Sequence, residues 1–189
     1  MGYYGESTLN IALIHYPVMN KNREVIGSAV TNLDIHDIAR TARTYGVAQY
    51  FVATPYEDQR TLVKELLEHW LSGYGAVYNP ARREALELIV LVNSLADALE
   101  DLHTRYGRRP MLVATSAQVR SSMTGYSEIK DALDRREPVL LLFGTAHGLA
   151  PEIMNCVDTC LPPLQGKTSY NHLSVRSAAS IIIDRLLGT

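Results

Sequence analysis

The sequence predicts an α/β fold in which a mostly parallel six-stranded sheet carries helices on both faces. Short apolar runs alternate with amphipathic helical patterns from one end of the chain to the other. Several of these runs are apolar on both sides, as is typical of strands that helices cover on each face. The 189 residues fit one core, and no linker or internal repeat divides them. We therefore expect residues 1–189 to form a single domain.

Six apolar segments are the expected strands. They cover residues 10–18, 48–54, 86–92, 110–115 and 138–145, with a short strand at 159–162. The segments between them are long enough for the helical crossovers that parallel strands require, and such crossovers are right-handed.

Helical patterns fill the intervals between the strands. In the first, Asp34 is the expected N-cap, apolar residues recur at the spacing of one helix face, and Gly46 ends the helix. Further helices are expected in 57–73, 94–107 and 126–137. A last helix follows Asn171, its expected cap. Its apolar stripe consists of Val175, Ala178, Ala179, Ile182 and Leu186.

Composition limits the possible partners. Acidic residues outnumber basic ones by 20 to 18, so a nucleic-acid site must be a local patch. The N-terminus lacks the pattern of a signal peptide, and the apolar runs are too short to span a bilayer. We therefore expect a cytoplasmic protein with no membrane partner.

Cys156, Cys160 and the scattered histidines form no metal-ligand pattern, which favours two reduced, partly buried thiols and no metal.

Glycine and proline gather after the late strands, and the binding site is expected there. No dinucleotide-fold glycine pattern and no P-loop follows the first strand. Ligands of open α/β sheets lie beyond the carboxyl ends of the strands. In FGTAHGL, Gly144 and Gly148 would let the backbone approach a ligand, and Phe143 and Leu149 would be apolar walls. A tight turn out of a buried strand explains this segment equally well.

The segment LPPLQGKTSYNHLS, residues 161–174, has a second set of binding features. Its first four residues form a stiff apolar edge suited to a flat ring, and Gly166 would permit the turn that follows. Asn171 would cap the last helix with Ser174 in its first turn, where free amides favour a carboxylate. An aromatic ring and a carboxylate are both parts of S-adenosylmethionine.

Three segments in this order resemble the SPOUT superfamily of knotted RNA methyltransferases. They are TNLDIHDIARTARTYGV, LLLFGTAHGL and LPPLQGKTSYNHLSVRSAASIIIDRLLG. The resemblance extends over almost the whole chain from about Asn10, and it is strongest to a small single-domain bacterial family of S-adenosylmethionine-dependent RNA methyltransferases. One departure lies at Ala146 and His147, where the family is expected to have a glycine and a bulkier aromatic residue.

The resemblance implies a deep trefoil knot in about residues 110–187, with S-adenosylmethionine bent inside it. It also implies a homodimer whose interface includes the first and last helices. The loops after the last three strands would bind the cofactor. The residues carried over are Thr115, Ser116, Ala117, Phe143, Gly144, Thr145, Gly148, Leu149, Leu161, Pro163, Leu164, Gly166, Tyr170, Asn171, Leu173 and Ser174.

The same resemblance implies methyl transfer to a base nitrogen or a ribose 2′-hydroxyl of a structured RNA, either tRNA or rRNA. Asn32 and Arg40 would approach the reacting nucleotide, and Arg40 would stabilise developing negative charge. Helix capping and a solvated surface charge are the ordinary alternatives for these two residues. Asp34, His147 and His172 are weaker candidates for the base.

Two other functions remain compatible with the sequence: a SPOUT-like module that binds cofactor or RNA without turnover, and an α/β enzyme for another adenine-containing ligand. An RNA-binding face would have to be built from local basic residues. The candidates for such a face in a dimer are Lys21, Arg23, Arg40, Arg43, Arg82, Arg83, Arg108 and Arg109.

Overall fold

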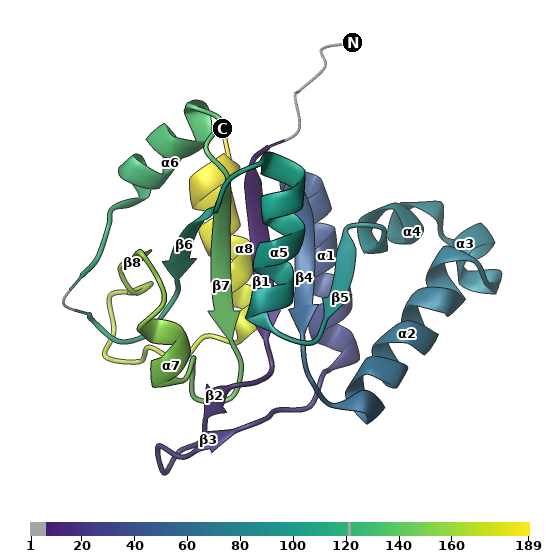
Figure 1. Cartoon of the computed structure of the whole chain (residues 1–189), viewed down its shortest axis with the longest axis horizontal. Helices are drawn as coiled ribbons and strands as arrows, with labels where there is room; N and C mark the ends of the chain where they lie inside the picture. The colour runs from purple at the N-terminus through teal and green to yellow at the C-terminus, as the bar shows by residue number, and fades with distance from the viewer. Residues whose placement is uncertain (1–6, 121) are drawn as a thin grey trace.

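The computed structural model, which describes residues 7–120 and 122–189, contains a six-stranded sheet between two layers of helices (Figure 1). The strand order is β5-β4-β1-β7-β6-β8, and all neighbours in it are parallel. The strands are β1 (Leu9–Ile14), β4 (Gln49–Ala53), β5 (Ile89–Val92), β6 (Met111–Ala114), β7 (Val139–Gly144) and β8 (Thr159–Cys160). Each coincides with a predicted segment, except that β1 begins one residue earlier, at Leu9, so the predicted fold class is confirmed.

The central strands β1 and β7 fix the positions of the loops at the carboxyl edge. Their register pairs Leu9 with Val139 at one end and Ile14 with Gly144 at the other. Every residue of β1 is buried, because helices cover both of its faces. The segments that follow β1 and β7 therefore begin side by side.

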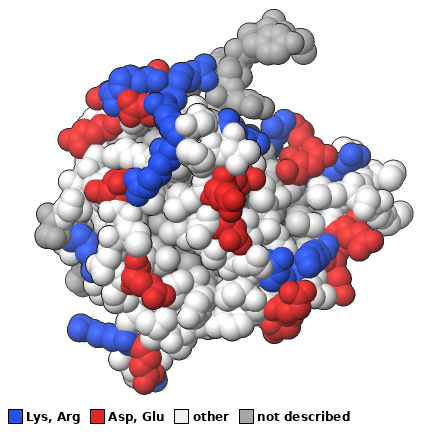
Figure 2. All heavy atoms as spheres, in the orientation of Figure 1, with Lys and Arg blue, Asp and Glu red and all other residues white. Residues whose placement is uncertain are grey.

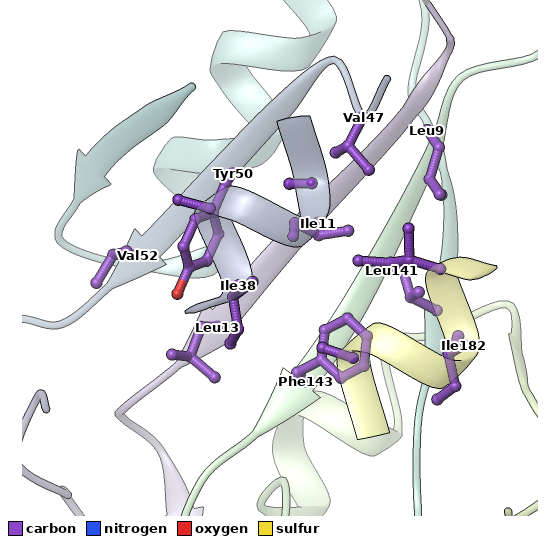
Figure 3. Packing of buried hydrophobic residues seen from close by; sticks show 14 of the residues in the cluster. Leu9, Ile11, Leu13, Ile38, Val47, Tyr50, Val52, Leu141, Phe143 and Ile182 are labelled. Atoms are coloured by element: carbon purple, nitrogen blue, oxygen red, sulfur yellow. The ribbon is translucent and has the colours of Figure 1, made fainter. Parts of the chain in front are cut away.

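Two helical layers enclose the sheet (Figure 1). One face packs against α1 (Asn32–Tyr45) and α8 (Val175–Leu187), with α6 (Tyr126–Asp134) beside α8. The other face packs against α5 (Leu95–Tyr106) and the short α7 (Pro151–Met154). Figure 3 shows the packing on the first face, where Leu13, Ile38, Phe143 and Ile182 belong to one buried cluster.

The crossover between β4 and β5 is longer than the others. It consists of α2 (Glu57–Leu71), α3 (Tyr74–Tyr78) and α4 (Pro80–Leu86), which extend beyond the edge of the sheet (Figure 1). The predicted helix at 57–73 corresponds to α2. Helices α3 and α4 were not predicted.

Helix α1 begins three residues before the predicted start. Its N-cap is Thr31, whose hydroxyl accepts a hydrogen bond from the Asp34 amide at 3.2 Å. The prediction that Asp34 is the cap was wrong, because its carboxylate pairs instead with Arg176 of α8 at 2.8 Å. The predicted end at Gly46 is confirmed by its left-handed backbone, φ 76°.

Helix α8 also begins differently. Ser174 is its N-cap and accepts a hydrogen bond from the Ser177 amide at 3.2 Å. Asn171 was predicted as the cap, but its side-chain amide donates to the Ala117 carbonyl at 3.1 Å. The two loops that follow β6 and β8 are thereby joined.

A hairpin that the sequence analysis missed follows β1. The predicted strand at 10–18 ends at Ile14, and β2 (Val18–Met19) then pairs with β3 (Val25–Ile26) in an antiparallel ribbon. The ribbon lies beyond the carboxyl edge of the large sheet, at the bottom of Figure 1.

The segment after β6 passes along the outer edge of β8. The Thr124 amide donates to the Cys160 carbonyl at 2.9 Å, and the hydroxyls of Thr124 and Thr159 lie 2.7 Å apart. Strand β8 thus lies between β6 and this segment before the chain continues to α8. The trefoil knot that the resemblance implies stays a prediction.

In residues 7–120 and 122–189, no helix is long and apolar enough to cross a membrane. The same residues contain no group of three or more His, Cys, Asp and Glu side chains placed to hold a metal ion. Both cysteines are free; Cys160 is buried, whereas Cys156 is exposed. The expectation of partial burial was therefore wrong for Cys156.

Candidate functional site

A cavity of about 1340 Å³ lies at the carboxyl edge of the sheet. The loops after β1, β6, β7 and β8 and the start of α8 surround it, because the carboxyl ends of parallel strands meet at one edge. Small-molecule pockets measure roughly 300–1,000 Å³. The cavity therefore has room for a nucleoside cofactor and for part of a second molecule.

Most of the predicted cofactor residues border this cavity. Those that line it are Thr115, Ser116, Ala117, Phe143, Gly144, Thr145, Gly148, Leu149, Leu161, Leu164, Tyr170, Asn171, Leu173 and Ser174. Pro163 and Gly166 are not among the lining residues, whereas Pro162 is. The structure brings these loops together, and their role in binding stays a prediction.

The turn after β7 needs glycine at position 144 for its own geometry. A Cβ atom there would lie 2.7 Å from the Leu149 nitrogen and 2.9 Å from the Gly148 carbonyl carbon. Gly148 has φ +104°, and Ala146 has φ 50°. The missing Cβ of Gly144 leaves space for the returning backbone, which shapes the cavity wall; the expected approach of this backbone to a ligand stays a prediction.

Gly166 has no comparable constraint. A Cβ atom at this position would meet no atom within 4 Å, and its φ is not positive. The prediction that a glycine permits a special turn here was therefore wrong. The apolar start of the segment packs against the sheet: Leu161 is buried, and its amide donates to the Ala114 carbonyl at 2.9 Å.

A buried histidine supports the cavity wall from behind. His15 follows β1 directly, is fully buried, and places Nδ1 3.1 Å from the Ser28 hydroxyl. Ser28 in turn contacts the Thr145 hydroxyl, which donates to the Ile14 carbonyl at 3.0 Å. Ser28 and Thr145 both line the cavity. This chain connects the loop before α1 to the turn after β7.

Burial keeps His15 neutral. It lowers the pKa of the imidazole from 6.5 to about 4, although the nearby Asp34 carboxylate acts in the opposite direction. The Nε2 atom is buried and has no hydrogen-bond partner among the described residues. A proton on this ring would leave a charge in the protein interior.

A polar wall adjoins the predicted cofactor loops in the cavity. It includes Ser28, Thr31 and Asp34 from the N-terminal part of the chain and Arg176 from α8. The Asp34 side chain is only 8% exposed, and Arg176 holds its Oδ1 at 2.8 Å. Asp34 Oδ2 makes no hydrogen bond in the part of the chain that the structure describes. The sequence placed Asp34 among the base candidates but gave no sign of its ion pair.

The two predicted catalytic residues lie elsewhere in a single chain. Arg40 is exposed on α1 and does not line the cavity. Asn32, in the first turn of α1, borders a separate cavity of about 340 Å³ between α1 and α2, together with Leu62 and Trp70. By contrast, His147 and His172 line the large cavity.

The basic residues proposed for one RNA-binding face are dispersed within the chain. Of them, only Lys21 and Arg23 line the cavity. Arg43 pairs with Glu84 of α4, and Arg83 pairs with Glu87, which directly follows α4. Arg82 lies over the Trp70 ring. The remaining candidates are Arg40, Arg108 and Arg109, and Arg109 pairs with Asp158.

The buried His15 predicts a pH dependence of stability. The pKa of His15 is about 4 in the folded protein and 6.5 in the unfolded chain. Between these two pH values the unfolded chain therefore binds more protons than the folded protein. Neutral His15 makes its full contribution to the free energy of unfolding above pH 6.5. As the pH falls from 6.5 to 4, this free energy decreases by roughly 3 kcal/mol. Urea unfolding of wild type and His15→Asn across this range measures it. Parallel pH profiles of the two proteins would contradict the assignment to His15.

Comparisons with known proteins agree with the geometry. Residues 8–188 match a family model described as SAM-dependent RNA methyltransferase. A tRNA (guanine-N(1)-)-methyltransferase of Oleidesulfovibrio alaskensis is 48% identical over 180 residues, which cover 95% of this chain and 42% of that protein. An Aquifex aeolicus protein without a described function is 41% identical over 93% of this chain and 86% of its own length. The chain thus spans less than half the length of the curated tRNA methyltransferase.

Solved structures show the same fold at low identity. A probable methyltransferase from Bordetella pertussis has a TM-score of 0.62 and 15% identity, covering 95% of this chain and 94% of that chain. The SpoU methyltransferase AviRb from Streptomyces viridochromogenes, in complex with AdoMet, has a TM-score of 0.59 and 19% identity over 97% and 58% of the two chains. With the match over residues 8–188, these findings show that the chain belongs to the family of S-adenosylmethionine-dependent RNA methyltransferases and has the fold of the SpoU (SPOUT) enzymes.

Proposed function

We propose that this chain transfers the methyl group of S-adenosylmethionine to a nucleotide of a structured RNA in the cytoplasm. The observation that carries the proposal is the cavity in which the three predicted cofactor loops meet a polar wall containing the buried Asp34. The bound cofactor supplies an activated methyl group. The protein then has to align an acceptor and take up one proton.

The residues around the cavity fit this cofactor. Leu149, Leu161 and Leu164 provide apolar surface for the adenine ring, and the loop after β6 offers the hydroxyls of Thr115 and Ser116. The glycine-dependent return of the turn after β7 brings backbone groups to the cavity wall, where they can hydrogen-bond to polar parts of the cofactor. These loops bind and orient, and the apolar residues exclude water.

The polar wall is suited to the acceptor. Arg176 fixes Asp34 through Oδ1, so Oδ2 is the oxygen available to receive a proton from a ring nitrogen or a ribose hydroxyl. The Thr31 hydroxyl accepts from the Asp34 amide and can donate its own proton to the same nucleotide. Asp34 is therefore the preferred proton acceptor over His147 and His172, which lie on exposed loop segments.

The relatives favour tRNA as the substrate and leave the acceptor atom open. The matched relative is named for N1 of guanine, but more than half of it lies outside the matched segment. The activity in its name therefore does not assign an atom to this domain. The alternative is binding without turnover, which is favoured by the absence of Arg40 and Asn32 from the lining residues in one chain.

A homodimer reconciles Arg40 with catalysis. Helices α1 and α8 run side by side and are joined by hydrogen bonds between Thr41 and Ser180 at 3.0 Å and between Tyr45 and Asp184 at 2.8 Å. They thus form one continuous surface. If two copies associate through it, Arg40 of one chain can act at the cavity of the other.

The cofactor assignment predicts different effects at two glycines. Gly144→Ala should weaken S-adenosylmethionine binding at least about tenfold, equivalent to about 1.4 kcal/mol, because the added methyl displaces the turn. Gly166→Ala should bind like wild type, since its Cβ meets nothing. Isothermal titration calorimetry measures both, with circular dichroism as the folding control. Absence of heat and of thermal stabilisation in the wild type at millimolar cofactor would reject the cofactor site.

The acceptor assignment predicts that Asp34→Asn lowers methyl transfer by roughly 10²–10⁴-fold while cofactor affinity is retained. The amide keeps an oxygen for Arg176 but is a poor base. Nucleoside mass spectrometry of total RNA, from cells with and without the wild-type protein, identifies the methylated nucleoside, and transfer to that RNA is then timed for both proteins. A wild type that binds the cofactor but changes no nucleoside supports the non-catalytic alternative.

The dimer model predicts complementation between two inactive variants. Arg40→Ala should reduce transfer by roughly 10²-fold or more with cofactor affinity unchanged. When Arg40→Ala and Asp34→Asn chains are mixed and exchanged, each heterodimer contains one site with both residues intact, so activity returns. Mixed chains that stay inactive would place Arg40 and Asp34 in the same chain's site. Full activity of Arg40→Ala alone would make it a surface residue.

A further inference from the structure

The mouth of the cavity has a positive charge that the chain as a whole lacks. The chain has a net charge of −2, yet Lys21, Arg23, Arg120 and Arg176 line the cavity. Asp34 is the one acidic residue among the described residues that line it. Because Arg176 pairs with Asp34 and Asp37, the other three cations determine the charge of the mouth.

These three cations are not engaged by carboxylates. Among the described residues, no carboxylate oxygen lies within 4.0 Å of Lys21, Arg23 or Arg120. Elsewhere on the surface, arginines such as Arg43, Arg83, Arg109 and Arg135 form ion pairs. Uncompensated cations at a concave site attract an anionic ligand.

The hairpin tip holds Lys21 and Arg23 in a defined conformation. The Asn20 side-chain oxygen accepts hydrogen bonds from the amides of Asn22 at 2.8 Å and Glu24 at 3.0 Å. The Asn20 amide group donates to the Glu24 carboxylate at 2.7 Å, which keeps this carboxylate away from the neighbouring cations. In Figure 2 the hairpin is the lowest part of the molecule, and blue atoms project from it beside a group of red atoms.

The hairpin is also joined to the turn after β7. The Met19 amide donates to the Gly148 carbonyl at 2.9 Å, and the His147 amide donates to the Met19 carbonyl at 2.9 Å. Val18 forms an antiparallel bridge with Leu149. A ligand on the hairpin is therefore held in a fixed position relative to the turn that shapes the cofactor wall.

We propose that the β2–β3 hairpin is the arm that binds the RNA backbone, with Lys21 and Arg23 contacting phosphates beside the acceptor nucleotide and Arg120 contacting the strand across the mouth. This inference rests on the proposed RNA methyltransferase function. S-adenosylmethionine has a single carboxylate and two cationic groups. Its one negative charge cannot pair with all three cations of the mouth. The backbone of an RNA whose nucleotide enters the cavity presents the required row of negative charges.

The test compares two charge-matched double variants. Lys21→Gln/Arg23→Gln removes two hairpin cations, and Lys64→Gln/Lys130→Gln removes two exposed cations from α2 and α6. Binding of fluorescently labelled bulk bacterial tRNA is measured by anisotropy at several salt concentrations, and cofactor binding is measured by calorimetry. The hairpin variant should bind tRNA at least tenfold more weakly, with the salt slope reduced by about 1.4–1.8, at roughly 0.7–0.9 per lost contact. Its cofactor affinity should match the wild type.

Each outcome decides between the two proposals. Unchanged tRNA affinity and salt slope in the hairpin variant would contradict the proposal that the hairpin binds RNA, and so would equal losses of affinity in both variants. Either result is compatible with methyl transfer by the wild type. A wild type that neither binds tRNA nor methylates any nucleoside of total RNA would contradict both RNA binding by the hairpin and the proposed function. Loss confined to the hairpin variant supports the arm.

Discussion

The parallel pairing of β1 with β7 is the constraint on which the site depends. It aligns Ile14 with Gly144, so two segments from opposite ends of the chain leave the sheet at the same point. From there, Thr145 donates to the Ile14 carbonyl, His15 reaches Ser28, and Met19 pairs with the returning turn at Gly148. A shift in this register would separate the cofactor turn from both the hairpin and the buried histidine.

The large sheet was predictable because its strands are apolar on both faces, which is a strong local signal. The hairpin was not, because strands of two residues have no measurable periodicity and their pairing depends on contacts with Gly148 and Leu149. The helix starts failed for a different reason. Thr31 and Asp34 are both good caps, and a carboxylate-guanidinium pair with a residue of α8 decides between them. Such a long-range pair leaves no local pattern.

The residues of the candidate site also divide into those that a local sequence pattern indicates and those whose position depends on long-range contacts. The cofactor loops could be carried over because each is a short contiguous segment with its own glycines and prolines. Pro163 and Gly166 failed to reach the cavity because a sequence does not show which side of an irregular loop faces inward. Arg40 and Asn32 lie outside the large cavity of their own chain, which the local sequence around them does not indicate. Asp34 became the leading acceptor residue only when its burial and its partner were known.

Charge is distributed in two zones around the cavity. Free cations lie at the exposed mouth, on the hairpin and after β6, whereas the carboxylate of Asp34 is buried and paired on the inner wall. Exposed cations lose little solvation when they meet phosphates, and their long-range attraction speeds encounter with RNA. Arg176 engages one oxygen of Asp34, and the cations of the mouth belong to other segments of the chain. Neutral His15 adds no further positive charge behind the wall at neutral pH. The proposed function requires this separation, because one cavity would bind a polyanion at its rim and take up a proton inside.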